Sequence, residues 1–243
     1  MVSSIKQLNK LLAEKNKPIL SRTFRYLSIF LAKPLLYTPI TANQVSFVNL
    51  FLPLISAFLF TFNNYTYSVI ASLILFFSVI LDFVDGDIAK YKKQKSLYGV
   101  YLECLYHEIA MPFVFLGLGI NAYNHYNNNL FIYLGVFVIL MVFIMNIVRL
   151  NKYKIILQSK KGLDKEFSPA LAMKKNKTHL QKIVFFIIGI FTKITMFWLV
   201  MLLFSVFNLL HYAISLYAIF YLIIGTSKIF IELRTGFKEF ENG

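Results

Sequence analysis

The sequence predicts an all-α fold: a polytopic membrane protein with six transmembrane helices and an N-terminal interfacial helix. Three observations support this class. Of the 243 residues, 58% are hydrophobic, above the fraction of about half that is usual in soluble domains. The apolar residues fall in long runs, each close to the roughly 20 residues that a bilayer-spanning helix needs. The basic residues lie almost entirely between alternate runs, so they collect on one side of the predicted membrane.

Six apolar runs are long enough to cross a bilayer. We predict spans over residues 45–62, 67–84, 97–120, 130–150, 183–207 and 211–231. These spans leave no room for a separate soluble domain, so residues 1–243 are expected to form one integral membrane domain. Within it we expect a cytoplasmic and interfacial segment (1–42), a six-helix transmembrane bundle (43–231) and a cytoplasmic tail (232–243).

The distribution of the net charge of +14 indicates how the helices are oriented. Lys and Arg precede the first span, separate spans two and three, fill the segment between spans four and five, and follow the last span. The opposite loops, residues 63–64, 121–129 and 208–211, contain neither Lys nor Arg. The positive-inside rule therefore predicts that both termini are cytoplasmic, in a cell (inner) membrane. Because the charge follows membrane topology, we do not expect nucleic acid as a partner.

The segment before the first span has an interfacial composition. From Ser21 to Leu36 basic residues alternate with Phe and Leu, which is typical of a helix lying on a membrane surface. Pro34 and Pro39 are expected to interrupt this helix. Thr41 then provides a suitable N-cap for the first span.

Acidic residues and an imidazole cluster on spans two and three. Asp82 and Asp85 are three residues apart, and Glu103 and His107 are four apart, so each pair shares a helical face. A helix from Ser68 to Lys95 would be about 42 Å long, against a hydrocarbon core of roughly 30 Å, which places all four groups near the inner boundary. Ionisable residues at membrane depth usually mark functional sites. If the two faces meet, three carboxylates and one imidazole form a site for metal binding and proton transfer.

Other polar residues receive structural interpretations. Cys104 is interpreted as a small buried apolar residue. Glu108 points about 100° away from His107 on the helix, so we interpret it as structural or interfacial. The basic segment 151–182 is predicted to be a solvated cytoplasmic connection. The remaining histidines lie far from the acidic cluster in this topology and are not expected to take part: His125, His179 and His211.

Lys193 is the one basic residue deep inside a predicted span. Two interpretations compete for it. Its ammonium group could contact the substrate or an internal acid, or its long side chain could reach towards the membrane interface.

The acidic cluster resembles the signature of the CDP-alcohol phosphotransferase (CDP-alcohol phosphatidyltransferase) family, D-x2-D-G-x2-A-R-x8-G-x3-D-x3-D, across spans two and three. The matching positions, with every spacing intact, are Asp82, Asp85, Gly86, Ala89, Lys90, Gly99, Glu103 and His107. Lys90, Glu103 and His107 replace the usual Arg, Asp and Asp, so the chain resembles a divergent member. The family's juxtamembrane helix, six spans and cytoplasmic termini also agree, and Thr41-Ala42-Asn43 is similar to its Thr-Pro-Asn at the first span.

The resemblance implies a reaction and a set of roles. An acceptor hydroxyl attacks the β-phosphorus of a CDP-alcohol, and CMP leaves. The first three acidic positions, Asp82, Asp85 and Glu103, would bind divalent metal (Mg²⁺ or Mn²⁺) at the diphosphate, and His107 would be the base. The remaining motif positions would contact the substrate: Asn43 beside the nucleotide, Gly86, Ala89 and Gly99 where the donor approaches closely, and Lys90 facing phosphate. The resemblance also implies a homodimer among membrane lipids.

Elementary chemistry agrees with these roles. A diphosphate repels carboxylates unless a cation lies between them, and Mg²⁺ prefers carboxylate and phosphate oxygens together. Such a metal offsets the charge on the leaving CMP. Imidazole titrates near neutral pH and can accept a proton from an alcohol, but it is a poor ligand for Mg²⁺ and a better one for Mn²⁺.

Alternatives differ in function and in substrate. The chain could bind CDP-alcohols without turnover because His107 replaces the aspartate, or it could be an ion-coupled transporter, although transporters place their charges nearer the bilayer midplane. CMP release distinguishes the transferase from both. Within the transferase class, either a CDP-lipid reacts with a small polyol or its phosphate, or a CDP-linked head group reacts with a lipid. Both arrangements belong to phospholipid or related lipid and glycan biosynthesis.

Overall fold

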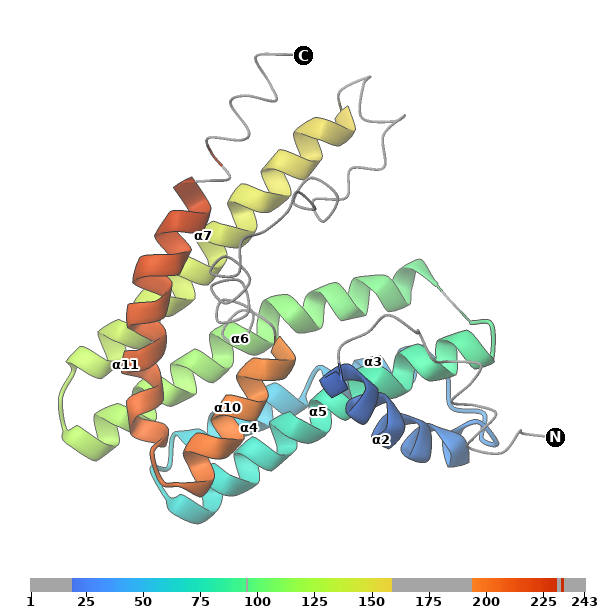
Figure 1. The fold of residues 1–243 in the computed structure, drawn as a ribbon, viewed down its shortest axis with the longest axis horizontal. Helices are drawn as coiled ribbons and strands as arrows, with labels where there is room; N and C mark the ends of the chain where they lie inside the picture. Colours follow the sequence, from blue (N-terminus) through green and yellow to red (C-terminus); the bar gives the residue numbers. More distant parts are fainter. Residues whose placement is uncertain (1–18, 95, 159–193, 231–232, 234–243) are drawn as a thin grey trace.

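The computed structural model describes residues 19–94, 96–158, 194–230 and 233, and over these residues the chain forms helices and no β-strand (Figure 1). The helices, with the bounds that the structure gives them, are α2 (Ile19–Leu35), α3 (Ala42–Asn49), α4 (Leu52–Phe60), α5 (Tyr65–Tyr91), α6 (Leu97–Tyr126), α7 (Leu130–Gln158), α10 (Ile194–Val206), α11 (Leu210–Phe220) and a π-helical turn (Tyr221–Gly225).

Five described helical segments are long and apolar enough to cross a membrane. They are Ala42–Phe60, Tyr65–Tyr91, Leu97–Tyr126, Leu130–Val148 and Leu210–Phe230. The predicted fifth span is represented by the shorter apolar helix α10, and its residues 183–193, including Lys193, lie outside the described residues. The chain is thus an all-α polytopic membrane protein, as predicted.

The first span is divided into two helices, where we predicted one. α3 ends at Asn49 and α4 begins at Leu52, with Pro53 in its first turn. Proline lacks a backbone N–H and its ring crowds the carbonyl group four residues earlier. The helix therefore breaks between Asn49 and Leu52, before continuing across the membrane.

Polar side chains begin three of the helices. At α3 the predicted cap is confirmed: the Gln44 amide N–H donates to Thr41 Oγ1 at 3.3 Å, and the Thr41 amide N–H donates to Gln44 Oε1 at 2.9 Å. This reciprocal pair is a capping box. Asn64 caps α5 and Ser96 caps α6. These caps fix the first turns of the helices that carry the acidic cluster.

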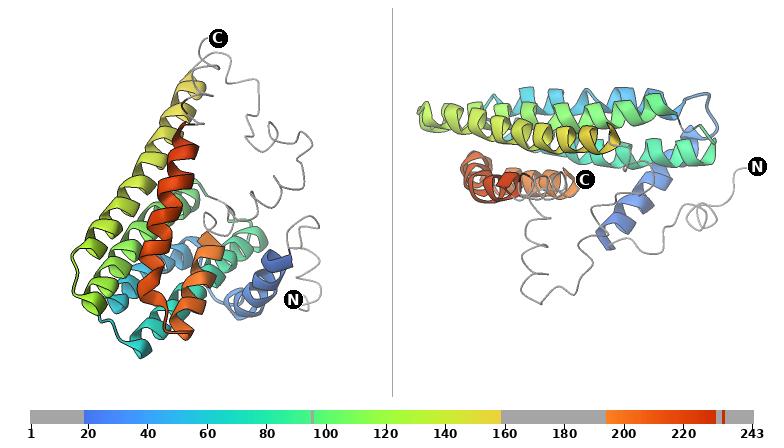
Figure 2. Two further views of the ribbon diagram at one scale, coloured as in Figure 1. Left: turned by 60° about the vertical axis from the view of Figure 1, so that its left-hand side comes forward. Right: turned by 90° about the horizontal axis from the view of Figure 1, so that it is seen from above.

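The bundle is organised around the first span. α3 and α4 pack on both α5 and α6, while α7 packs on α6, α10 on α5, and α11 on α6 and α7. A Cβ at Gly117 would collide with the carbonyl group of Ala57, so glycine allows α6 to lie directly against α4. α2 packs on α5, at the opposite side of the molecule from α7 and α11 (Figure 2).

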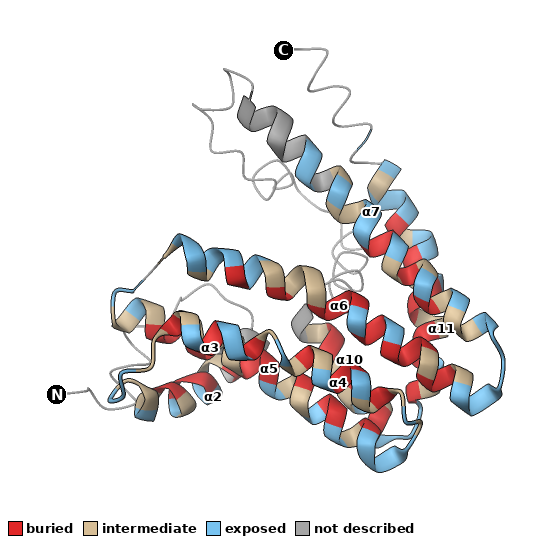
Figure 3. Ribbon diagram, turned by 180° about the vertical axis from the view of Figure 1, so that it is seen from behind, coloured by how far each residue is buried: buried red, intermediate tan, exposed pale blue. Residues whose placement is uncertain are grey.

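The buried residues concentrate where α4, α5, α6 and α10 meet, and the outward faces of the helices are exposed (Figure 3). Aromatic rings fill part of this core, since Phe115, Phe197 and Tyr217 contact one another at centroid distances of 4.8 to 5.4 Å. The exposed faces carry large apolar side chains, such as Phe58 and Leu140. Such surfaces are suited to lipid, because water would not solvate them favourably.

Two structural interpretations of the sequence were wrong. α7 continues to Gln158, so residues 151–158 are helical and not part of a loop; residues 159–182 lie outside the described residues. Cys104 is exposed on α6 and not buried. It lies between exposed Glu103 and half-buried Leu105, on a face of α6 that is not packed in the core.

Candidate active site

A cavity of about 290 Å³ lies between α3, α5 and α6. Seven of the predicted site residues line it: Asn43, Asp85, Gly86, Ala89, Lys90, Gly99 and Glu103. They come from three helices that the sequence separates by up to 60 positions, yet they surround one space. The motif residues on α5 and those on α6 therefore line the same cavity, and α3 forms its third wall.

Asp85 is held by a residue that sequence reasoning missed. Ser46 Oγ donates to Asp85 Oδ2 at 2.5 Å, and Ser46 also lines the cavity. Ser46 lies three residues after Asn43, so both project from one face of α3. That spacing from a predicted site residue is the sequence signal that could have identified Ser46. The bond helps to orient the Asp85 carboxylate at the cavity wall.

The two glycines of the motif have different roles. A Cβ at Gly99 would come within 2.8 Å of Asn43 Oδ1, whereas a Cβ at Gly86 would meet no atom within 4 Å. Gly99 therefore allows the start of α6 to lie against α3, where Ser96 Oγ donates to Asn43 Oδ1 at 3.1 Å. Gly86 leaves open space beside Asp85, which suits the approach of a ligand.

Asp82 and His107 lie beside the cavity but do not line it. Asp82 interacts electrostatically with both His107 and Glu103, so the three groups share one region between α5 and α6. Within the described part of the chain, however, no three His, Cys, Asp or Glu side chains are grouped closely enough to hold a metal ion together. The structure thus brings the predicted ligands into one neighbourhood without assembling them around a common point.

The carboxylate groups nevertheless suit a hard divalent cation as ligands. Asp85 and Glu103 face the cavity, and Asp82 interacts electrostatically with Glu103. Carboxylate oxygens are the protein ligands that Mg²⁺ and Mn²⁺ prefer. Lys90 lines the same cavity and supplies a positive charge that suits a phosphate group.

A buried hydrogen-bonded group lies one helical turn from the acidic residues. Tyr106 Oη is 2.8 Å from Ser78 Oγ and accepts from Trp198 Nε1 at 3.3 Å. All three side chains are buried, and they join α5, α6 and α10. Ser78 is four residues before Asp82, and Tyr106 adjoins His107. This group, which we did not predict, fixes the two motif helices relative to one another.

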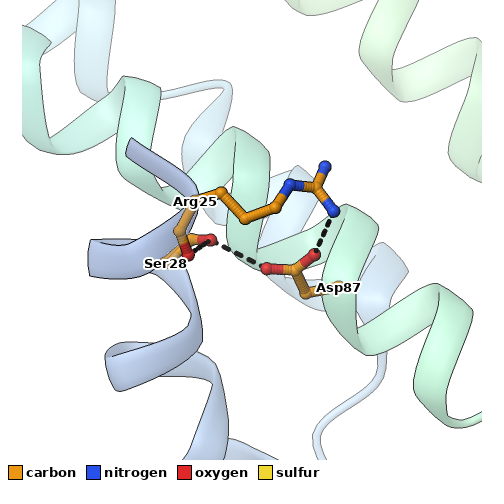
Figure 4. Close-up of polar contacts among 3 residues, drawn as sticks. All are labelled: Arg25, Ser28 and Asp87. Carbon is orange, nitrogen blue, oxygen red and sulfur yellow. Dashed lines mark hydrogen bonds and ion pairs between the residues drawn. The ribbon is translucent and has the colours of Figure 1, made fainter. Parts of the chain in front are cut away.

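Asp87 lies within the motif but points away from the cavity. Its carboxylate accepts from Ser28 Oγ at 2.7 Å and from Arg25 at 3.4 Å, both on α2 (Figure 4). A short distance along α5, Lys92 Nζ donates to the backbone oxygens of Thr38 and Ile40 at 2.8 and 2.7 Å. We predicted no specific partner for Arg25 or Lys92, and the structure gives partners to both.

Glu108 has the structural role that we expected, because Asn146 Nδ2 on α7 donates to its carboxylate at 2.6 Å. His125 and His211 lie at the far ends of α6 and α11, where their rings stack with centroids 4.0 Å apart. Neither lines the cavity.

Comparison with known proteins identifies the family. A search of curated proteins found no match. A sequence model of the family described as CDP-alcohol phosphatidyltransferase matches residues 39–227. The matched region covers most of the chain and includes α3, α5 and α6, which surround the cavity. The chain therefore belongs to the CDP-alcohol phosphatidyltransferase family.

Proposed function

We propose that this protein transfers a phosphoalcohol group from a CDP-alcohol to an acceptor hydroxyl and releases CMP, with the cavity between α3, α5 and α6 as the donor site. The observation that carries the proposal is that Asp85, Gly86, Ala89, Lys90, Gly99 and Glu103 all border one cavity. Family membership supports a transferase acting on this class of donor. A volume of about 290 Å³ is at the lower end of small-molecule sites, and the cavity is flanked by further polar groups.

The charges around the cavity suit a diphosphate. Lys90 would contact the phosphate oxygens, and the open face of Gly86 would admit the donor beside Asp85. Asp82, Asp85 and Glu103 would hold a divalent cation, Mg²⁺ or Mn²⁺. When bound, the ion would offset negative charge on the diphosphate and the departing CMP.

Proton transfer falls to His107 in this proposal. The acceptor oxygen forms a bond to the β-phosphorus while the bond from that phosphorus to the CMP oxygen breaks. The acceptor proton moves to a ring nitrogen of His107, and CMP leaves with the bonding electrons. Asp82, which interacts electrostatically with His107, would stabilise the imidazolium that forms.

The site would lie at the cytoplasmic side of a cell membrane, because the positive-inside rule assigns Lys90 and its neighbours to that side. The basic surface there favours a phosphorylated acceptor. The donor would then be a CDP-lipid and the acceptor a polyol phosphate. The products would enter phospholipid or related lipid and glycan synthesis.

Product analysis tests the proposal. The purified protein in nanodiscs of native lipids would receive labelled CDP-lipid or CDP-linked small alcohol, with each acceptor class, in the presence of Mg²⁺ or Mn²⁺. We expect metal-dependent CMP release together with one labelled lipid product, and a strong loss of CMP release in Asp85→Asn. Binding of a CDP-alcohol without CMP release would indicate the inactive family member, and transport of an ion without either would indicate the transporter.

We also propose that the protein forms a homodimer in the membrane. The outward faces of the described helices carry ample apolar surface for one. Single-molecule photobleaching in bilayers at low protein density should show two-step bleaching. One-step bleaching throughout would contradict the dimer without affecting the proposed reaction.

A further inference from the structure

Asp87 is placed on α5 so that it serves a different purpose from Asp85. The two residues are separated by about 200° around the helix axis. Asp85 lines the cavity, whereas Asp87 is 1% exposed and faces α2. A buried carboxylate is costly unless charged and hydrogen-bonding groups compensate it. Ser28 and Arg25 supply these groups, so the position of α2 on α5 is specified by charge as well as by apolar packing.

Aromatic contacts surround this ion pair. Phe24 stacks on Phe83 with centroids 6.1 Å apart and contacts Phe76 at 5.4 Å. The guanidinium carbon of Arg25 lies 6.0 Å from the centroid of the Phe83 ring, within the range of a cation–π interaction. One turn of α2 thus provides apolar, cationic and hydroxyl contacts to the same stretch of α5.

Lys92 secures the other end of α2. Its ammonium group donates to the backbone oxygens of Leu35, Thr38 and Ile40, at 3.4, 2.8 and 2.7 Å. The first of these residues ends α2, and the other two belong to the connection that leads to α3. A Lys side chain at a helix C-terminus satisfies carbonyl groups that have no partner within the helix. Lys92 therefore attaches both the end of α2 and the connection to α5.

The attached connection leads directly into the cavity wall. Thr41 caps α3 immediately after Ile40, and Asn43 and Ser46 follow on the first turns of α3. Ser46 then donates to Asp85, and Asn43 accepts from Ser96 at the start of α6. The contacts of α2 with α5 are consequently connected to the orientation of Asp85 through the short connection of residues 36–40 and the capped start of α3.

From these contacts we infer that α2 is a positioning element of the site, held by an α2 clamp that consists of Arg25, Ser28, Asp87 and Lys92. The clamp fixes the start of α3, so that Ser46 meets Asp85 and Asn43 meets α6. Its effect on turnover rests on the proposed function. The matched family region begins at residue 39, after α2, so family membership does not itself assign α2 this role.

A set of charge variants tests the clamp. Arg25→Met removes the guanidinium from buried Asp87, and we expect kcat with a CDP-alcohol to fall about tenfold, a coupling of ordinary size for paired groups. The double variant Arg25→Met/Asp87→Asn should regain most of this loss, because a neutral amide can still accept from Ser28 and needs no cation. Lys33→Met, which removes one charge from the same helix, is the matched control and should retain parental kcat. Lys92→Gln gives a second variant at the other end of the clamp.

A distance measurement separates the clamp from the proposed reaction. In a Cys104→Ala background, spin labels at Tyr26→Cys on α2 and Tyr101→Cys on α6 would report the position of α2; both native side chains are exposed. We expect one narrow distance distribution in the parent, a broader one in Arg25→Met, and a narrow one again in the double variant. An unchanged distribution in both Arg25→Met and Lys92→Gln would overturn the clamp, whether or not the protein releases CMP. A broadened distribution with parental kcat would overturn the positioning role, and a parent without turnover would contradict the proposed function alone.

Discussion

The two ends of the bundle use polar side chains in different ways. At the end opposite the cavity, Asn121 Nδ2 donates to the Phe60 carbonyl at 2.8 Å and Asn124 Nδ2 donates to the Thr61 carbonyl at 2.7 Å. Asn64 accepts from the amides of the first turn of α5. The side chains of these three asparagines thus bond to backbone groups at helix ends, which have no partner within the helix. At the cavity end, Asp85 accepts from a serine, and its surroundings leave room for a ligand.

The histidines show the same contrast. His125 and His211 stack on each other at the far end, among residues 121–130 and 206–211, which contain no Asp, Glu, Lys or Arg. His107 instead interacts electrostatically with Asp82, one turn from Glu103. The comparison teaches that polarity alone does not mark a site in this fold. The candidate site is distinguished by charged groups, Asp85, Lys90 and Glu103, that line an open volume.

The largest effect should come from the carboxylates at the cavity end. We expect Asp82→Asn or Asp85→Asn to reduce CMP release by roughly 10⁴-fold, because a bound cation contributes several kcal/mol of charge stabilisation in the transition state. The measurement is initial rate of CMP release over a range of Mn²⁺ concentrations. Asn124→Ala, at the opposite end, is the control and should keep the parental rate. Equal losses in Asp85→Asn and Asn124→Ala would remove the distinction between the two ends.

A smaller loss is expected for His107, the proposed base. His107→Ala should reduce turnover by about 10²-fold, the lower part of the range for acid–base groups, because His107 lies beside the cavity and not in its lining. Donor binding should be retained, and His107→Asp should recover part of the rate. Parental turnover in His107→Ala would exclude His107 as the base.

Tyr106→Phe should have an intermediate effect that combines stability with turnover. It removes the phenol oxygen shared by Ser78 and Trp198, and a buried polar group that loses its partner costs about 1–3 kcal/mol. We expect a lower melting temperature and a several-fold lower rate. Ser72→Ala is the matched control: Ser72 is buried on α5 and bonded to Ser205 on α10 at 2.6 Å, so its loss should lower stability alone. The same rate loss in both variants would show that Tyr106 acts only through stability.

The smallest effect is expected at the far end. His125→Ala removes one ring of the stacked pair with His211, and such ring pairs contribute about 0.5–1.5 kcal/mol. We expect a small decrease in melting temperature and no change in CMP release. A strong loss of turnover in His125→Ala would mean that the far end takes part in the reaction.

The sequence was sufficient for the helices and for most of the cavity. Apolar runs predicted the bounds of Ala42–Phe60, Leu130–Val148 and Leu210–Phe230 to within a few residues, because the hydrocarbon thickness determines helix length. α5 and α6 continue past the predicted ends of spans two and three, to Tyr91 and Tyr126, and the start of the fifth span lies outside the described residues. The capping box at Thr41 was predicted from residue types because its partners are local. The spacing of the acidic residues identified Asp85 and Glu103, since residues on one helical face recur at fixed intervals, and the resemblance to the family motif added Gly86.

The structural features that the sequence did not predict depend on contacts between helices. The motif spacing singles out Asp85 and not Asp87, but it does not reveal their partners, which are Ser46 on α3 and Arg25 on α2. The break before α4 was missed although Pro53 was visible, because the first span is apolar on both sides of it. The exposure of Cys104 depends on how the helices pack around α6, which only tertiary structure determines.

The central claim is that the carboxylates around the cavity bind a CDP-alcohol together with a divalent cation. Thermal unfolding of the protein in nanodiscs, with and without CDP-alcohol and Mn²⁺, tests it most directly. At a donor concentration of about 100 times its Kd, the parent should gain about 2.7 kcal/mol, and only when both donor and metal are present. Asp85→Asn should show no such gain, while Asn124→Ala should match the parent. A gain of equal size in Asp85→Asn, or no gain in the parent, would contradict the claim.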